Sequence, residues 1–596
     1  MNRLPVNPAQ QKYLWPAVLA VILVAFFFRF YRLADHPLGI FFDPAINGLD
    51  AERLMQRGGP VIFFPTNGGR EAMFMYMLIP SIWLFGSTPF ALRAITATAS
   101  LLNVVLLFAS IHQLRIANFQ LRITNYEWRN SQLIFALLAA LTLATMPWAI
   151  EVSRLGQRPV LVPLLAVPIF WFFLRGWAGG RRGWFIASGA LLGLAGHTYS
   201  AARLLPLILL LALLPEIFIR SQGAGAQATP SLAARHSQFK IQNSKFFGLL
   251  LFAAAAGVVF APMGWYLLTH PAQFTERAGS VMVWNFLNTP AAIAAEIGHN
   301  ALRVAGFFCC AGSPNPIFGL PGYPGLSPLL APFLLLGLAL ALKNWRNLFY
   351  RLVALWWLIG IAPSVIAIEA PHPLRMIAAL PATAILVALG LVQLPIITDQ
   401  LSKKLPPRFQ SYGLQFAFHL LPILLILLPL PGLFRAYFID WTARQDTRGV
   451  YDYGAIAIRD AVLAHADDST AVYLPLARFG DSPLLYYLSG PFKREARTTV
   501  TPAPNAIVIA PEKNAADAAW VRLFNGRATL LPPLNPFGQQ LIQSALASDS
   551  AQTILIPFSN EPAARLAPLA QNPAPYIQGV TDVFEASFGA FELTGA

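Results

Sequence analysis

The chain has 596 residues, of which 56% are hydrophobic and only 12% are charged, and its mean hydropathy is +0.55. Together with repeated apolar runs, this composition excludes a single soluble domain and indicates a polytopic membrane protein. The formal net charge is +15, but residues 433–596 hold 12 basic and 15 acidic residues, whereas the first 432 residues hold 30 basic and 12 acidic residues. Since no basic patch with interleaved aromatic residues stands out, we expect no nucleic-acid partner.

The N-terminal segment carries Arg3 and Lys12 before an apolar run at residues 14–30. No small-residue cleavage site of the A-x-A kind follows this run, so we interpret it as a retained signal anchor. The only cysteines, Cys309 and Cys310, are adjacent in an apolar context. Their pattern predicts small core residues and indicates neither a disulfide framework nor a thiolate metal site.

Eleven apolar segments have the length, or nearly the length, of a membrane span. They lie at about residues 14–30, 88–113, 132–149, 159–175, 184–197, 203–219, 247–268, 326–342, 352–368, 376–397 and 414–432. We therefore expect a polytopic α-helical membrane module of about 11 transmembrane helices over residues 1–432. Its two long outer loops are expected at residues 31–87 and 269–325.

The Lys and Arg residues of alternate connections predict the orientation, because basic residues near helix ends stay on the cytoplasmic side. Eighteen basic residues lie in one set of connections and ten in the longer opposite set. The first set comprises the N-terminus and residues 114–131, 175–183, 220–246, 343–351 and 398–413. We expect a multi-pass protein of the cell (cytoplasmic) membrane, with a cytoplasmic N-terminus and an extracytoplasmic C-terminal domain.

Acidic residues show the reverse asymmetry, since nine of the twelve in the first 432 residues fall on the predicted outer side. Acidic residues contribute little to topology, so this bias indicates an outward-facing polar site. In the first outer loop, residues 45–55 and 72–85 are expected to form interfacial helices, separated by glycine-rich breaks at 58–60 and 67–69. In the second outer loop, an amphipathic helix near 291–304 is expected before an irregular proline- and glycine-rich run.

The composition changes after residue 431. Short apolar runs at residues 471–475, 506–511 and 553–558 alternate with helix-like stretches near 454–466, 513–524 and 538–547. This alternation predicts an extracytoplasmic α/β domain over residues 433–596. No glycine-rich fingerprint follows these runs, so nucleotide binding is not expected there.

Asp43 is the first candidate for chemistry, and it lies among Phe41, Phe42 and Pro44 shortly after the first predicted helix. A carboxylate beside aromatic residues at a membrane surface is partly desolvated, which suits a general base that accepts a proton from a hydroxyl or an amine. Asp43 is equally placed to cap a helix, with Pro44 at the first helical position, where proline is favoured. The spacing alone leaves both interpretations open.

A second cluster lies in the turn between the third and fourth predicted helices. It contains Glu151, Arg154 and Arg158. The two arginines are four residues apart, so they can share one helical face and grip an anionic phosphate. The alternative is that each arginine snorkels to lipid headgroups.

Two further outer turns join an imidazole to a guanidinium. One is the stretch 197–203, which contains Tyr199 and Arg203, and the other contains His372 and Arg375. Cations on this face can hold a lipid-linked phosphate as a leaving group and stabilise its developing charge.

A divalent cation, Mg²⁺ or Mn²⁺, is a possible cofactor, but whether a metal is present stays open. Such an ion needs several converging oxygen ligands. Asp43, Glu71 and Glu151 are the only set that the sequence offers.

Six segments resemble, in chain order, segments of bacterial membrane glycosyltransferases of the GT-C superfamily. They are FDPAINGLDAERL, FFPTNGGREAMFMYM, STPFALRAITA, SRLGQRPVLVPLL, HTYSAARLLPL and PHPLRMIAALP. The nearest groups are the dolichyl-phosphate-mannose-protein mannosyltransferases and the aminoarabinose transferases of lipid A. The resemblance covers roughly residues 14–400 as an ordered set.

This resemblance implies inverting transfer of a sugar from a polyprenyl-phosphate donor, without a nucleotide, with Asp43 as the base of the first loop. The family often has Asp-Glu at this place, whereas this chain has Asp43 followed by Pro44. Glu71 or Glu151 is then the candidate for the missing second carboxylate. The resemblance also implies that the donor phosphate contacts Arg154, Arg158, Arg203 and Arg375, with Tyr199 nearby.

The sequence therefore predicts a hexosyl- or pentosyltransferase of the cell envelope whose acceptor is a protein, a lipid or a glycan. One alternative is a transporter or flippase of lipid-linked sugars. Such proteins place ionisable residues at the bilayer midplane, on broken helices, whereas the acidic residues here fall in outer loops. The other alternative is a catalytically inactive GT-C scaffold, which Pro44 leaves open.

Overall fold

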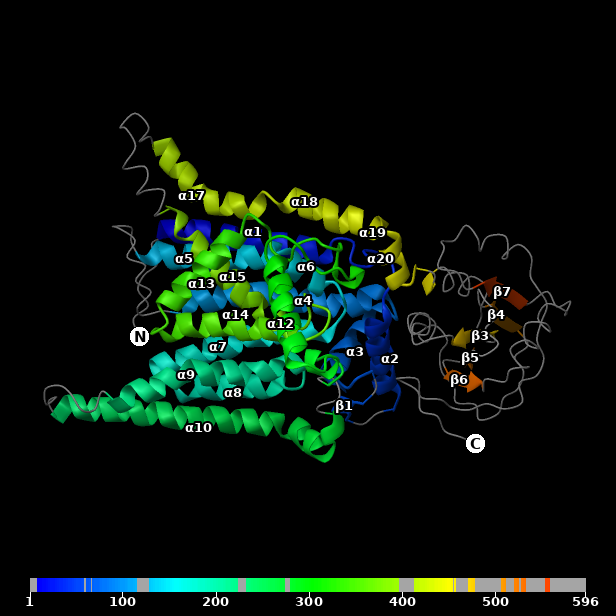
Figure 1. Ribbon diagram of the computed structural model, residues 1–596, viewed down its shortest axis with the longest axis horizontal. Coiled ribbons are helices and arrows are strands. Elements are labelled where there is room, and N and C mark those ends of the chain that lie inside the picture. Colours follow the sequence, from blue (N-terminus) through cyan, green and yellow to red (C-terminus); the bar gives the residue numbers. More distant parts are fainter. Residues whose placement is uncertain are drawn as a thin grey trace. The chain divides into compact units, whose positions relative to one another are not determined.

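The computed structural model describes residues 8–57, 60–65, 67–114, 128–222, 232–273, 279–395, 412–453 and 455–456, and five strands between residues 470 and 557. The chain divides into two compact units, and each is described by itself. The first unit comprises Met1–Tyr31, Ile62–Met73 and Thr96–Tyr437. The second comprises Arg32–Val61, Phe74–Ile95 and Phe438–Ala596. Figure 1 labels the elements of both units.

The first unit is built from helices, most of which run side by side in Figure 1. The helices are α1 (Pro8–Phe30), α4 (Pro89–Gln113), α5 (Trp128–Thr145), α6 (Pro147–Ser153), α7 (Leu161–Gly179), α8 (Arg182–Ala195), α9 (Leu204–Gln222), α10 (Leu232–Thr269), α12 (Pro290–Phe307), α13 (Ala331–Lys343), α14 (Leu348–Val365), α15 (Leu380–Leu391), α17 (Tyr412–Leu427) and α18 (Leu430–Arg435). Each of the eleven predicted apolar segments overlaps at least one of these helices. The prediction of a helical membrane fold is therefore confirmed.

Membrane crossing is supported for part of this set. Among the described residues, five helices are long and apolar enough to span a bilayer, or six if the bent pair α5 and α6 forms one broken span. Several other helices, such as Ala331–Lys343, are apolar but shorter. The total of eleven spans stays a prediction, because a perpendicular span needs about 20 residues.

Glycines bring α8 and α10 into close contact. A Cβ atom on Gly189 would lie 2.1 Å from the carbonyl oxygen of Phe252, and one on Gly193 would lie 2.5 Å from that of Ala256. Small residues at four-residue spacing let two membrane helices approach backbone to backbone. His197 adds a hydrogen bond, since its Nε2 lies 3.0 Å from the carbonyl oxygen of Val259.

Buried arginines tie other helices of the first unit together. Arg29 on α1 is fully buried, and its guanidinium donates to Ser100 Oγ on α4 at 2.9 Å and to the carbonyl of Ala144 on α5 at 2.9 Å. Arg351 on α14 pairs with Glu216 on α9 at 2.9 Å. Each of these buried arginines has partners, which avoids the cost of an unsatisfied buried ion.

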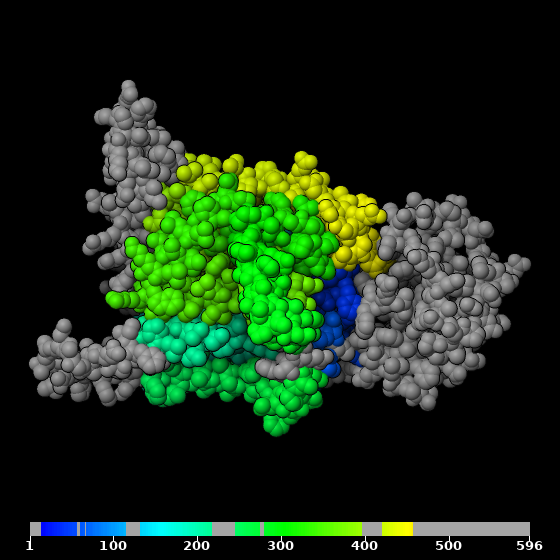
Figure 2. All heavy atoms as spheres, in the orientation of Figure 1, coloured from blue at the N-terminus to red at the C-terminus, as the bar shows by residue number. Residues whose placement is uncertain are grey.

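Helix α12 crosses the other helices steeply and lies on the surface of the first unit (Figures 1 and 2). Its N-terminus is capped by Thr289, whose hydroxyl accepts a bond from the Ala292 N–H at 3.2 Å. The helix confirms the amphipathic helix predicted near residues 291–304. The run after it is irregular as expected, apart from the 3₁₀ turn η4 (Pro316–Phe318).

The prediction for the two cysteines is wrong. Cys309 and Cys310 come shortly after the end of α12, beyond Phe308, and form a disulfide, and Cys310 is exposed. The apolar letters around them suggested a core position, but the chain has left the helix there and turns at the surface.

The described part of the second unit begins with α2 (Phe42–Arg57) and α3 (Met73–Phe85), which confirms helices in the first predicted outer loop. Arg93, at the start of α4, donates hydrogen bonds to the carbonyls of Leu33, Pro37 and Gly39 and so fixes the segment before α2. The π-helix η7 (Ala436–Asp440) passes from the first unit into the second, where α19 (Trp441–Ala443) and α20 (Gln445–Val450) follow it.

A five-stranded mixed sheet lies in the C-terminal region, with the strand order β6-β5-β3-β4-β7. The strands are β3 (Thr470–Leu476), β4 (Asn505–Ala510), β5 (Ala519–Phe524), β6 (Arg527–Leu531) and β7 (Thr553–Pro557). Strands β3, β4 and β7 coincide with the three predicted apolar runs. The helix-like stretch predicted at 513–524 is wrong in its second half, because β5 pairs there antiparallel to β3. The stretch at 538–547 and most of 454–466 lie outside the described residues.

Candidate functional site

A two-stranded hairpin in the first unit presents Glu71. Strand β1 (Phe63–Phe64) pairs antiparallel with β2 (Arg70–Glu71), with Phe63 opposite Glu71. The turn between them contains Asn67, Gly68 and Gly69, which have φ values of 54°, 69° and 80°. Glycine adopts this left-handed region without steric cost. The predicted glycine-rich break at residues 67–69 is therefore confirmed as a tight turn.

The hairpin is anchored on α10 through Phe63. The Phe63 side chain is buried against Met263 and Leu267, and its ring lies 5.2 Å from that of Tyr266. Because Gly69 lacks a side chain, the Phe63 ring packs directly against its Cα; a Cβ there would lie 2.7 Å from the ring. This packing fixes the strand that carries Glu71.

Two arginines converge on the Glu71 carboxylate. Arg158 Nε lies 3.3 Å from Oε2, and both side chains are at most 6% exposed. An Arg203 Nη lies 3.8 Å from Oε1, and the Arg203 side chain is 34% exposed. Arg158 begins the 3₁₀ turn η1 (Arg158–Val160) before α7, and Arg203 ends the 3₁₀ turn η2 (Ser200–Arg203) before α9. We call Glu71, Arg158, Arg203 and Tyr199 the Glu71 cluster.

Arg158 is the more firmly held of the two arginines. Its guanidinium lies over the ring of Tyr199, 5.5 Å from the centroid, and donates to the carbonyl of Gly69 at 3.3 Å. A guanidinium over an aromatic face gains a favourable cation–π interaction. The structure thus brings together four residues that the sequence placed in three separate turns.

Arg154 lies apart from this cluster. It is fully buried, donates to the carbonyls of Phe28 and Arg29 at 3.3 and 2.9 Å, and lies over the ring of Tyr437. The expectation that Arg154 and Arg158 share one helical face is wrong. Helix α6 ends at Ser153, and Gly156 then takes a φ of +70°, which breaks the helix between the two arginines.

Glu151 lies on α6 and is 5% exposed. The loop after α12 covers it, so closely that a Cβ on Gly319 would lie 2.5 Å from its Oε1. Burial raises the pKa of Tyr323, and the Glu151 carboxylate raises it further. Tyr323 therefore keeps the proton of its hydroxyl and remains a hydrogen-bond donor.

His372 and Arg375 occupy the turn before α15. The His372 ring packs against Phe318 of the covering loop, with 4.8 Å between centroids. Arg375 pairs with Glu369 at 3.4 Å and donates to the carbonyl of Ile368. Trp148 on α6 donates to the carbonyl of Pro373 at 3.1 Å, which fastens this turn to the helix of Glu151.

Asp43 belongs to the second unit. It lies in the first turn of α2, which begins at Phe42, so Pro44 is the third helical residue rather than the first. Asp43 is half-buried, between the buried residues Phe41 and Pro44. A carboxylate in the first turn is stabilised by the helix dipole.

A metal site is not supported in the part of the chain that the structure describes, where no group of three His, Cys, Asp or Glu side chains is placed to hold a metal ion. Both oxygens of Glu71 face guanidinium nitrogens. Glu71 is thus already paired with cations, which does not suit a ligand of a divalent cation.

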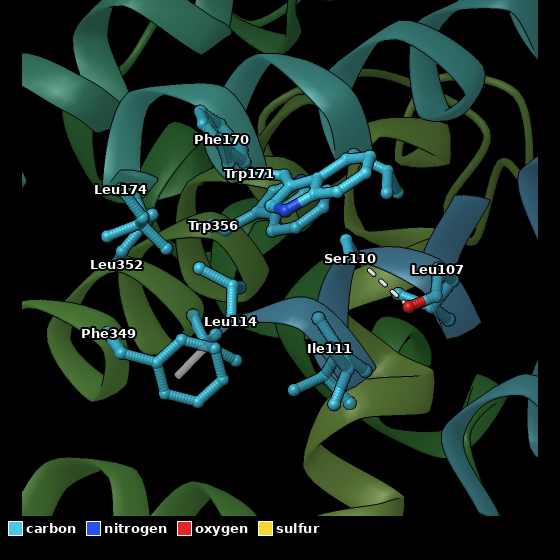
Figure 3. A pocket seen from close by; sticks show the side chains of 13 residues that line it. Leu107, Ser110, Ile111, Leu114, Phe170, Trp171, Leu174, Phe349, Leu352 and Trp356 are labelled. Carbon is cyan, nitrogen blue, oxygen red and sulfur yellow. Dashed lines mark hydrogen bonds between the residues drawn. The ribbon is translucent and has the colours of Figure 1, made fainter. Parts of the chain in front are cut away.

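The cavity in Figure 3 is a different feature, formed between α4, α7, α14 and α15. Its lining is almost wholly aliphatic and aromatic, and the hydroxyl of Ser110 is turned to the carbonyl of Leu107 at 2.9 Å. Its lining residue on α7 nearest to Arg158 is Val167, nine residues along the chain, or about 14 Å at the helical rise. The cavity therefore lies away from the Glu71 cluster.

Sequence reasoning missed two residues of these sites. Gly69 supplies a carbonyl to Arg158, and Gly319 gives room to the Glu151 carboxylate. The glycine-rich turn and the SPNPIFGLPGYPGLSP run were visible as irregular segments. The residue pattern of these two segments does not show which carboxylate or arginine a glycine in them will contact.

These features define a helical membrane protein with a buried, charged cluster at the start of two helices. No protein-family model matches the sequence, and no curated protein sequence matches it. Among solved structures, the chain is similar to the crystal structure of ArnT from Cupriavidus metallidurans bound to undecaprenyl phosphate. The TM-score is 0.51 at 14% identity, over 84% of this chain and 86% of ArnT.

Two more solved structures are similar at lower scores. The apo form of the same ArnT has a TM-score of 0.46 at 13% identity, over 84% of this chain and 86% of that one. The oligosaccharyltransferase AglB from Archaeoglobus fulgidus, in complex with an inhibitory peptide and a dolichol-phosphate, has a TM-score of 0.45 at 14% identity, over 85% of this chain and 63% of AglB. The similarity to ArnT shows a shared fold.

Proposed function

We propose that the chain is a membrane glycosyltransferase that moves a sugar from a polyprenyl-phosphate donor to an acceptor on the outer face of the membrane. The observation that carries this proposal is the convergence of Arg158 and Arg203 on one carboxylate. Two guanidiniums that neutralise one anion at a fixed place can also bind a phosphate group. ArnT, which has the same fold, was crystallised with undecaprenyl phosphate.

In the proposed reaction, Asp43 takes the proton of the acceptor hydroxyl or amine. The freed lone pair attacks the anomeric carbon from the face opposite the phosphate, and the bond between the sugar and the phosphate oxygen breaks with inversion. The polyprenyl phosphate leaves with the electron pair of that bond. Arg158 and Arg203, with Tyr199 behind Arg158, stabilise the negative charge that develops on it.

The remaining candidates have supporting places in this proposal. His372 and Arg375 add to the cationic side of the donor site. Glu151, which is buried under the loop after α12, serves as the second carboxyl group. It replaces the Glu that the family often has at the position of Pro44. Arg154 has no part in it, because its guanidinium already binds the carbonyls of Phe28 and Arg29.

The same proposal includes the orientation predicted by the charge census. The N-terminus is cytoplasmic, the Glu71 cluster faces outward, and the C-terminal domain is extracytoplasmic. The polyprenyl tail stays in the bilayer throughout, so only the sugar leaves the lipid phase.

The experiment uses the full chain in lipid nanodiscs, with undecaprenyl-phosphate sugars labelled in the sugar and a membrane extract as the source of acceptor. Wild type is compared with Asp43→Asn, which keeps the shape of the side chain and removes the base. We expect transfer by wild type and a loss of about a hundredfold or more in Asp43→Asn, the size of a general-base contribution. Transfer that Asp43→Asn leaves unchanged would remove Asp43 from the mechanism, and a chelator in the same assay tests metal dependence.

A further inference from the structure

The Glu71 carboxylate occupies the place between two guanidiniums that a substrate phosphate would need. It is 3.3 Å from Arg158 and 3.8 Å from Arg203, and its own side chain is 4% exposed. Without this anion, the two partly buried cations would lose this counter-charge, which is costly. Glu71 therefore acts as the counter-charge of the two arginines.

The two ion pairs are unequal. Arg158 is buried and is also held by the carbonyl of Gly69 and the ring of Tyr199. Arg203 is one-third exposed and lies at the longer distance from Glu71. An exchange of partners therefore costs less at Arg203 than at Arg158, because the exposed side chain is better solvated when its pair opens.

The reaction makes this exchange useful. The donor is a phosphodiester with one negative charge, whereas the leaving polyprenyl phosphate is a monoester with about 1.5 to 2 negative charges at neutral pH. Two arginines without a competing anion would hold the product more tightly than the donor. Such a site would be inhibited by its own product.

We infer that Glu71 is a positioning residue that competes with the leaving polyprenyl phosphate for Arg203 and so promotes its release. Arg158 keeps its pair with Glu71 while its guanidinium also faces the phosphate, and Arg203 turns from Glu71 to the phosphate and back. This inference rests on the proposed function. In this inference Glu71 is not the general base, because each of its carboxylate oxygens already faces a guanidinium.

The test measures binding of radiolabelled undecaprenyl phosphate to the full chain in nanodiscs, with undecaprenol as the uncharged comparison. Glu71→Gln removes the competing charge and keeps the size of the side chain. We expect it to bind undecaprenyl phosphate about threefold more tightly than wild type, the effect of one partly exposed ion pair. In turnover, kcat falls while KM for the donor does not rise, a split that a merely structural role would not produce.

Two controls make the result specific. Glu296→Gln removes the same charge from an exposed pair with Arg303, at 3.4 Å, and should leave binding unchanged. In an Arg203→Gln background, the gain from Glu71→Gln should disappear, because the two residues no longer compete. If Glu71→Gln does not fold, the inference is tested with Arg203→Gln alone. This variant must then bind undecaprenyl phosphate more weakly than wild type.

The outcomes separate two failures. If wild type binds undecaprenyl phosphate no better than undecaprenol, the proposed function fails and the inference fails with it. If wild type prefers the phosphate but folded Glu71→Gln binds it equally or more weakly, only the inference is overturned. An unchanged affinity in Arg203→Gln also overturns it.

Discussion

Gly319 lies directly against the carboxylate of Glu151, so that a methyl group at position 319 would come within 2.5 Å of Oε1. Its φ of +123° also disfavours any other residue. Gly319→Ala should therefore displace Glu151 and lower the transfer rate about tenfold or more, since small displacements at a reacting site are costly.

Gly322→Ala is the matched control for this change. Gly322 has a φ of +79° in the same loop, but a Cβ there would meet nothing within 4 Å. Gly322→Ala therefore has the strain of alanine at a positive φ but adds no contact to Glu151. Equal loss of transfer in both variants would show that loop strain, rather than Glu151, is responsible.

The buried pair of Glu71 and Arg158 should dominate the stability of the hairpin. Arg158→Gln leaves the Glu71 carboxylate buried, with only the longer contact to Arg203. We expect a loss of about 3 kcal/mol, typical of one partner removed from a buried pair. Thermal unfolding in nanodiscs measures it, with Arg303→Gln, on an exposed pair, as the control. Equal unfolding temperatures for the two variants would contradict a buried pair.

The contact of α8 with α10 depends on the missing side chain of Gly193. Gly193→Ala would place a Cβ 2.5 Å from the carbonyl oxygen of Ala256 and 2.8 Å from Val259 Cβ. Overpacking of this kind costs about 1–3 kcal/mol, and it would also disturb the bond between His197 and Val259. Gly257→Ala on α10 meets nothing within 4 Å, so it should be neutral or stabilising. A melting temperature unchanged by Gly193→Ala would refute the close packing.

The disulfide between Cys309 and Cys310 makes a chemical prediction. A maleimide should label neither cysteine before reduction and should label the exposed Cys310 afterwards. Because the bond joins adjacent residues, it closes almost no loop and adds little to stability. The double change to serine should therefore retain transfer activity. Labelling of unreduced protein, followed by mass spectrometry, would argue against the bond.

Sequence reasoning was most successful where one physical effect decides the structure. Apolar length located a helix in each of the eleven predicted segments, and the glycine-rich break at residues 67–69 predicted a turn. The pattern predicts a helix-like stretch at residues 513–524, although Trp, Val and Phe in its second half, AWVRLF, favour strands. There the pairing partner in β3, far away in sequence, decided the outcome.

The sequence predicted which types of residue belong to the candidate site, but not which residues they contact. Arg154 and Arg158 look equivalent in the sequence, yet one binds backbone carbonyls and the other binds Glu71. The difference comes from Gly156, whose left-handed conformation turns the chain between them. Likewise, no spacing indicated that Glu71 would meet arginines from two other turns, because those contacts depend on how the helices pack.

A doubly labelled donor distinguishes sugar transfer from transport of the intact lipid. An undecaprenyl-phosphate sugar carries one isotope in the sugar and another in the prenyl chain, and wild type in sealed vesicles is given the donor with membrane acceptors. The account predicts that the two labels separate, with the sugar label in an acceptor and the prenyl label in free undecaprenyl phosphate. If both labels cross the vesicle membrane together in the intact donor, the protein is a transporter and the account is contradicted.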